Sequence, residues 1–245
     1  MEFDLALGDI WVYLSTSPLL HLTLTLLAYL AGDWLFRRSG RKALFNPVLL
    51  SILMLVTVLT ATGTRYETYF EGAQFVHFML GPATVALAIP LYRHLDLVRR
   101  LWLPILVSIV TGAVVSVTST ILIADWLGAS RQTLISLAPK SVTAPVAMGI
   151  TEKVGGLPSL TAALVVLTGV LGAVIGPAVL AAVRVRDDRA RGLALGLSAH
   201  GIGTARAFQI GSLAGAFSAL AMGLTAMASA FVLPALLRWV FGDFG

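Results

Sequence analysis

Long apolar runs without charged side chains dominate the pattern of the chain. A helix needs about 20 mostly apolar residues to cross the hydrocarbon core of a bilayer. Three runs contain no acidic, basic or histidine residue: 101–124, 154–183 and 207–237. Three less regular runs follow the same pattern: 10–32, 43–64 and 72–92. The pattern therefore predicts an all-α polytopic membrane protein with about six to eight transmembrane or re-entrant helices.

Proline and glycine indicate where the less regular runs begin or break. Because proline suits the first turn of a helix, the run at 43–64 is expected to be helical from Pro47. The run at 10–32 is expected to begin its helix near Pro18. The run at 72–92 is interrupted by Gly81, Pro82 and Pro90, so it is predicted to be a broken helix.

Two further segments, 134–150 and 192–210, are hydrophobic but unlike ordinary spans. The first is interrupted by Pro139, Lys140, Ser141, Thr143 and Pro145, and the second by His200, Gly201, Gly203, Thr204 and Arg206. Broken backbone and charge at membrane depth are tolerated where they are buried in protein or line a wet cavity. These two segments are therefore the first places to look for a function.

The charges of the loops predict a topology. Basic residues gather in three loops, at 37–42, 93–100 and 184–191, whereas the N-terminus is acidic. Positive loops face the cytoplasm, so we expect all three inside, the N-terminus outside and the protein in the bacterial inner membrane. Between the second and third basic loops, the two clean runs 101–124 and 154–183 cross the membrane once in each direction. Segment 134–150 is thus predicted to be a re-entrant hairpin, since a full crossing would place one basic loop outside. Segment 192–210 could cross or re-enter.

Composition agrees with the bilayer and excludes other classes. Only 12% of the 245 residues are charged, against about 25% in soluble domains. The net charge of +5 fits cytoplasmic loops, so no nucleic-acid partner is expected. Cysteine is absent, which excludes disulfides, thiolate metal sites and thiol catalysis. No phosphate loop, zinc motif or nucleophile elbow occurs, so we expect neither an enzyme nor a cofactor or metal site.

A weak internal repeat relates two of the broken segments within a single domain spanning residues 1–245. Residues 80–90 can be laid over 137–147 so that leucine, proline and valine coincide and Thr84 falls on Ser141. The repeat-like halves would be 72–127 and 132–184. Paired broken segments in corresponding positions indicate the binding site of a transporter. Chance similarity between two proline-broken helices is the alternative.

Lys140 is the first candidate site residue. An ionisable side chain within a membrane segment is costly to bury and indicates function. Ser141 and Thr143 place hydroxyl groups beside it, and Thr84 would be their counterpart in the repeat. A cation with hydroxyls and freed backbone amides suits a small carboxylate. The competing interpretation is a lysine whose ammonium reaches the interface.

Residues 200–206 (HGIGTAR) form the second candidate. Glycine lets backbone approach a ligand closely, Thr204 offers a hydroxyl, and the guanidinium of Arg206 matches a carboxylate. His200 could carry a proton near neutral pH. The competing interpretation has Arg206 ending a short helix at the interface and His200 as a satisfied core residue.

Four motifs, in order along nearly the whole chain, resemble those of the LrgB family. They are residues 80–92 (LGPATVALAIPLY), 136–147 (SLAPKSVTAPVA), 155–161 (GGLPSLT) and 198–206 (SAHGIGTAR). This family includes LrgB, CidB and the LrgB-like half of the plastid glycolate/glycerate translocator.

The resemblance implies one of two functions. One is a secondary transporter of small hydroxy- or keto-monocarboxylates (glycolate, glycerate, lactate or pyruvate), which could be proton-coupled and homodimeric. The other is an antiholin-like membrane protein that acts with an LrgA-like partner to modulate murein hydrolase export and autolysis. Lysine, histidine and arginine in broken segments favour the carrier, because an assembling pore needs only apolar helices.

Overall fold

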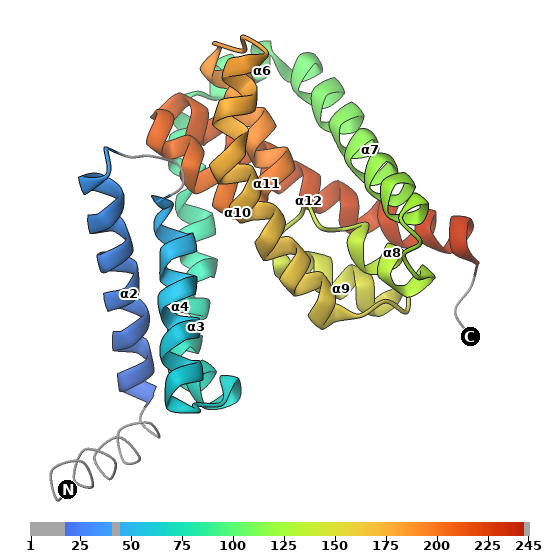
Figure 1. Ribbon diagram of the computed structural model, residues 1–245. Helices are drawn as coiled ribbons and strands as arrows, with labels where there is room; N and C mark the ends of the chain where they lie inside the picture. Colours follow the sequence, from blue (N-terminus) through green and yellow to red (C-terminus); the bar gives the residue numbers. More distant parts are fainter. Residues whose placement is uncertain (1–17, 41–44, 243–245) are drawn as a thin grey trace, which may run out of the picture. The chain divides into compact units, whose positions relative to one another are not determined.

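The computed structural model describes residues 18–40 and 45–242, and within them the chain forms helices and no strands. The helices are α2 (Pro18–Arg38), α3 (Pro47–Thr62), α4 (Tyr66–Ala86), α5 (Ala88–Arg93), α6 (Leu95–Arg100), α7 (Trp102–Trp126), α8 (Arg131–Leu137), α9 (Ala144–Lys153), α10 (Pro158–Ala182), α11 (Asp188–Ile210) and α12 (Ser212–Phe241) (Figure 1). The predicted all-α class is confirmed. Two compact units divide the chain, at residues 1–86 and 87–245, and each is described by itself.

The first unit packs α2 against α3 and α4. The predicted starts at Pro18 and Pro47 are confirmed. Asn46 caps α3, because its side-chain oxygen accepts hydrogen bonds from the backbone N–H groups of the first turn. Small residues set the spacing, since a Cβ on Gly72 would lie 2.1 Å from the carbonyl oxygen of Pro18. Residues 10–17 of the predicted run at 10–32 lie outside the described residues, as do 1–9 and 41–44.

Four described helices are long and apolar enough to cross a membrane: α2, α7, α10 and α12. They correspond to the three clean runs and to the run at 10–32. The run at 43–64 gives the shorter α3, and the run at 72–92 is divided between α4 and α5 at Leu87. The predicted break is therefore present, but not at Gly81, Pro82 or Pro90, because α4 continues through Pro82 and α5 contains Pro90. Two expected boundaries were also wrong. The helix of run 154–183 begins only at Pro158, after Gly155 adopts φ +73°, and residues 207–210 belong to α11 rather than to α12.

Helices α8 and α9 form a hairpin beside the C-terminal end of α12 (Figure 1). Both ends of this hairpin lie there. The Arg238 guanidinium donates to the carbonyl of Lys153 at the end of α9 (3.2 Å). At the start of α8, Arg131 Nη2 is 3.7 Å from the position of a Cβ on Gly242. The chain therefore forms a hairpin over 134–150, as predicted, from α8, a turn and α9.

Buried hydroxyls tie this hairpin to the start of α10. Thr161 Oγ1 donates to the carbonyl of Ser136 (3.0 Å) and so accepts from Thr151 Oγ1 (2.9 Å). The backbone N–H of Leu157 donates to Ser136 Oγ (2.8 Å). All three hydroxyl-bearing residues are buried. Because each buried hydroxyl has a partner, the network fixes the hairpin without leaving polar groups unpaired.

Helix α11 is a second hairpin, because its backbone reverses at Ala199 and His200. His200 has φ +40° and ψ −129°, which no helix contains. After the turn the returning limb packs on the outgoing limb, since a Cβ on Gly203 would lie 2.3 Å from the carbonyl oxygen of Leu195. Segment 192–210 therefore folds back on itself and does not form one continuous helix. Glycine at position 203 is what allows the two limbs to approach each other this closely.

The two hairpins begin at opposite ends of α12. Gly192 and Gly196 of α11 pack on the backbone of Ala214 and Ser218, in the first turns of α12, whereas α8 and α9 pack near its last turns. The start of α7 also packs at the N-terminal end, where Ile105 contacts Phe217. The two basic loops of this unit, before α7 and before α11, consequently lie at the same end, as the loop charges predicted.

The N-cap of α11 offers a test of loop electrostatics. Asp187 Oδ1 accepts from the backbone N–H of Arg189 (2.8 Å), and the Arg189 guanidinium also donates to this carboxylate. Hydrogen bonding to the Arg189 side chain holds the pKa of Asp187 well below its usual value of about 4. Because the pKa of Asp187 is lower in the folded than in the unfolded protein, its carboxylate stabilises the fold at any pH above the unfolded-state pKa. That stabilisation is lost as the pH falls through the folded-state pKa.

We expect Asp187→Asn to lower stability by less than about 1 kcal/mol at pH 7, because the pair is exposed and asparagine still caps the helix. The difference from wild type should shrink between pH 5 and pH 2. Thermal unfolding of the detergent-solubilised protein at several pH values measures it. A difference that grows as the pH falls would contradict the assignment.

Candidate functional site

The tips of the two hairpins both contact Val165 in α10. Val142 and Ala147, from the tip of the first hairpin, pack against the Val165 side chain. The His200 ring, at the tip of the second, has Nε2 3.0 Å from the Val165 carbonyl oxygen. The fold thus brings the two segments that interrupt the apolar pattern to the same turn of α10, around Val165. Their tips are about 60 residues apart in sequence.

Lys140 and Ser141 lie at the tip of the first hairpin, next to hydroxyls from other helices. Lys140 Nζ donates to Ser141 Oγ (3.3 Å), which lies 3.0 Å from Ser116 Oγ on α7. Thr143 ends the same tip in the N-cap position of α9, where its side chain forms no capping bond. One cation is therefore held beside several hydroxyl groups.

A small cavity adjoins this tip. Its volume is about 10 Å³, enough for about one water molecule. Four hydroxyl residues line it: Ser116, Ser141, Thr225 and Ser229. Leu197 of the second hairpin also lines it, so both hairpins contribute walls. Thr225 is buried, and its hydroxyl finds no hydrogen-bond partner among the described residues.

Sequence reasoning missed Ser116, Thr225 and Ser229, because all three lie in runs that look like plain spans. A signal was present. Thr225 and Ser229 are four residues apart in a mostly apolar helix, so they share one face of α12. A polar pair on one face of a span indicates either a helix contact or a site.

At the tip of the second hairpin, the hydroxyl of Thr204 forms hydrogen bonds within the protein. Thr204 Oγ1 donates to the carbonyl of His200 (2.8 Å), so the hydroxyl of Ser218 must donate to Thr204 (3.0 Å). His200 is buried, 5% exposed. Gly169 makes room for its ring, since a Cβ there would lie 2.7 Å from His200 Cε1. His200 and Thr204 therefore fix the shape of the reversal, and the His200 ring is a polar group of this tip that faces α10.

The structure does not bring every predicted site residue to the tips. Arg206 lies near the end of the returning limb, where its guanidinium donates to Gln209 Oε1 (2.7 Å). That position is at the base of the second hairpin. Thr84 belongs to α4 in the first unit, and its side chain is outside the described set. The predicted residues that share the level of Val165 are Lys140, Ser141, Thr143 and His200.

Comparison with known proteins decides the family. The model of the LrgB-like family matches residues 25–239, which include both hairpins and every helix from α3 to α11. The chain belongs to the LrgB-like family. The resemblance seen in the four motifs is thus confirmed, and the protein is a multi-pass membrane protein.

Relatives match along almost their whole length. The chain is similar to YwbG of Bacillus subtilis (39% identity; 89% of this chain and 97% of the relative) and to YxaC of the same organism (36%; 89% and 94%). It is also similar to the antiholin-like protein LrgB of Bacillus mycoides (30%; 91% and 97%). No solved structure matches the chain.

The unpaired hydroxyl in the cavity leads to a prediction. We expect Thr225→Val to leave stability unchanged or to raise it by up to about 1 kcal/mol, because it removes a buried hydroxyl without a partner at nearly constant volume. Ser218→Ala is the contrast. It deletes a paired hydroxyl and should cost about 0.5–1.5 kcal/mol. Thermal unfolding in detergent compares the two, and a larger loss for Thr225→Val would show that its hydroxyl is paired.

Proposed function

We propose that this member of the LrgB-like family is a secondary carrier of small hydroxy- or keto-monocarboxylates of the glycolate, glycerate, lactate or pyruvate class. One observation carries the proposal: two hairpins enter from opposite ends of α12, and their tips meet where Lys140 adjoins a hydroxyl-lined cavity. Broken helices that meet midway are the architecture of many carrier sites.

The chemistry of the tips supports a small carboxylate. The Lys140 ammonium would neutralise the carboxylate, and a charge-assisted hydrogen bond is the strongest single contact the site offers. Hydroxyls of Ser141, Ser116 and Thr225 can donate to the carboxylate or to a 2-hydroxy or 2-keto oxygen. His200 would link the second hairpin to the same level and could take the proton of a coupled transport cycle.

The size of the cavity implies movement. A volume of about 10 Å³ cannot hold a hydroxy acid, so binding requires the tips to separate. Because the hairpins have their bases at opposite ends of α12, displacement of one would open the site to one side only. That is the property that alternating access demands. A homodimer, with the N-terminus outside and the basic loops inside, is the assembly that we propose.

An antiholin-like function is the second candidate, and it is favoured by a relative's name. The Bacillus mycoides relative is named antiholin-like protein LrgB, and this supports the second candidate better than it supports a carrier. In this role the chain would act with an LrgA-like membrane protein to modulate murein hydrolase export and autolysis. The buried polar groups at the hairpin tips would then serve packing rather than a ligand.

Reconstitution separates the two candidates. The purified chain, alone in proteoliposomes, should take up labelled glycolate or pyruvate, with unlabelled monocarboxylates competing and larger solutes excluded. An imposed proton gradient tests coupling. Uptake that appears only with an LrgA-like protein would support a joint assembly. Absence of any monocarboxylate uptake, together with release of larger solutes, would reject the carrier.

A further inference from the structure

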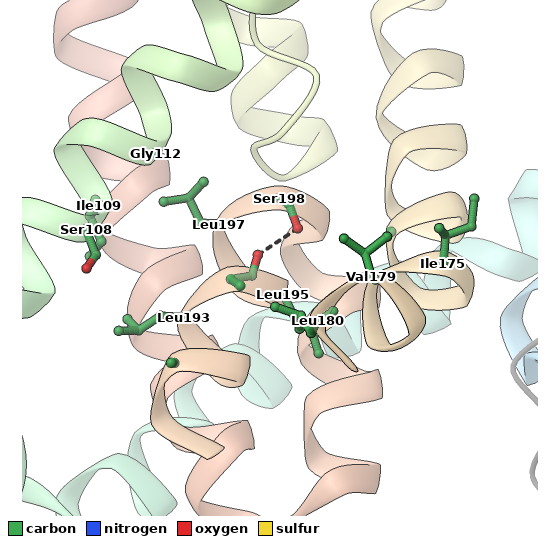
Figure 2. Close-up of a pocket in the computed structure, with 14 residues that line it drawn as sticks. Ser108, Ile109, Gly112, Ile175, Val179, Leu180, Leu193, Leu195, Leu197 and Ser198 are labelled. Carbon is green, nitrogen blue, oxygen red and sulfur yellow. Dashed lines mark hydrogen bonds between the residues drawn. The ribbon is translucent and has the colours of Figure 1, made fainter. Parts of the chain in front are cut away.

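An apolar groove runs along the second unit between α7, α10 and the outgoing limb of α11 (Figure 2). Its volume is about 640 Å³. Leu195 and Leu197 contribute from α11, whereas Ile175 and Val179 contribute from α10 and are about half exposed. Ser198 adds little polarity, because its hydroxyl donates back to the carbonyl of Ala194 (2.7 Å, dashed in Figure 2). The groove therefore suits hydrocarbon.

Two glycines allow α7 and α10 to lie close to α11 along the groove. A Cβ on Gly112 of α7 would lie 2.7 Å from Leu197 Cδ1, and a Cβ on Gly176 of α10 would lie 2.8 Å from Leu195 Cδ2. Both helices thus approach the outgoing limb closely, and the leucines close the space between them.

A cationic pocket is lined by residues that neighbour the groove residues in sequence. This second pocket, of about 370 Å³, is lined by Arg184, Arg186 and Arg191 with Ala181 and Val185. The pocket lies close to the groove, because Leu180 and Ala190 of the groove directly precede Ala181 and Arg191 of the pocket.

The three arginines of the pocket differ in their ion pairs. Arg191 pairs with Asp188 (3.2 Å). Arg184 and Arg186 are exposed and form no ion pair with any residue that the structure describes. Two guanidinium groups consequently remain available to an anion, and guanidinium matches a phosphate through paired N–H donors.

We infer that the groove and the pocket together bind an anionic phospholipid, with an acyl chain along the groove and the phosphate between Arg184 and Arg186. Only an anionic amphiphile complements both halves: a free phosphate would leave the apolar half unfilled, and a neutral lipid would leave the arginines unpaired. Basic pockets between helices at the cytoplasmic end of a membrane protein are typical binding places for such headgroups.

The test compares lipids on the purified full chain in detergent, by native mass spectrometry and by thermal unfolding. Phosphatidylglycerol should remain bound and raise the melting temperature more than phosphatidylcholine of the same acyl chains, and inorganic phosphate should do neither. The double variant Arg184→Asn/Arg186→Gln should lose about 30-fold in affinity for phosphatidylglycerol, or about 5-fold per arginine. Asparagine is chosen because Arg184 has φ +60°, which asparagine tolerates.

Two further variants keep the inference falsifiable. Arg99→Gln/Arg100→Gln removes the same charge from the other basic loop of this unit and should leave the affinity unchanged. Ala194→Trp fills the groove and should weaken both lipids. Equal losses in the two arginine variants, or phosphate stabilising as well as the lipid, would overturn the inference. So would Ala194→Trp changing the oligomeric mass without changing lipid binding, because the groove would then hold a protein.

Discussion

Lys140→Met is expected to lower monocarboxylate uptake by about 10- to 100-fold in proteoliposomes. The substitution keeps an unbranched side chain of similar length and removes the cation that the proposed site presents to the carboxylate. Hydrogen bonds to a charged group contribute about 1.5–3 kcal/mol, which sets the expected factor. Lys140→Arg keeps the charge but changes its geometry, so it should retain part of the activity.

A matched control lies in the same hairpin. Lys153 ends α9 with an exposed side chain, and its backbone carbonyl accepts a hydrogen bond from Arg238. Lys153→Met should therefore transport like wild type. Protein amount and melting temperature are measured for each variant, so that a folding defect is not mistaken for a transport defect. Full uptake by Lys140→Met would remove Lys140 from the site.

Gly196→Ala is expected to destabilise the protein by about 1–3 kcal/mol. Its Cβ would lie 2.1 Å from the Ser218 carbonyl oxygen and 2.8 Å from Ser218 Cα. Both atoms belong to the backbone of α12, so the helices must move apart and the second hairpin must shift on its support. Overpacking of this kind costs more than the helix propensity that alanine gains over glycine.

Gly223→Ala is the control for this prediction. It adds the same methyl group to α12, where nothing lies within 4 Å of the new Cβ. Helix propensity alone then applies, and the variant should be about 0.5–1 kcal/mol more stable than wild type. Thermal unfolding in detergent should thus move in opposite directions for the two alanines. A similar shift for both would show that the contact between Gly196 and Ser218 is looser than described.

Much of the fold followed from the sequence because lipid imposes a simple rule. Helices α7, α10 and α12 were found from runs without charge, and Pro47 marked the start of α3 through its fixed φ. The hairpin of α8 and α9 followed from loop charges. The reversal at His200 did not, because a histidine at positive φ is set by tertiary packing against Gly169 rather than by local preference.

The candidate site was predicted only in part. Lys140 and His200 stood out because a charge or an imidazole is rare in a span. Thr225 and Ser116 did not, since a hydroxyl costs little in an apolar run and its partners come from other helices. Arg206 was assigned because its guanidinium matches a carboxylate and lies close to His200 in the sequence, but its place at the base of the hairpin depends on the reversal at His200. The relevance of Thr84 stays a prediction from the repeat.

The packing of both hairpins on α12 has a consequence for synthesis. The first hairpin buries Val154 and Ile150 against Leu233 and Leu237, and Arg238 bonds to Lys153 across 85 residues of chain. At roughly 5–20 residues per second, the supporting helix emerges roughly 4–17 s after the hairpin. During that interval the broken backbone around Pro139 can pack on α7 and α10, but the surface that α12 supplies is still missing. The hairpin therefore completes its packing only when α12 arrives, because lipid cannot satisfy its free backbone groups.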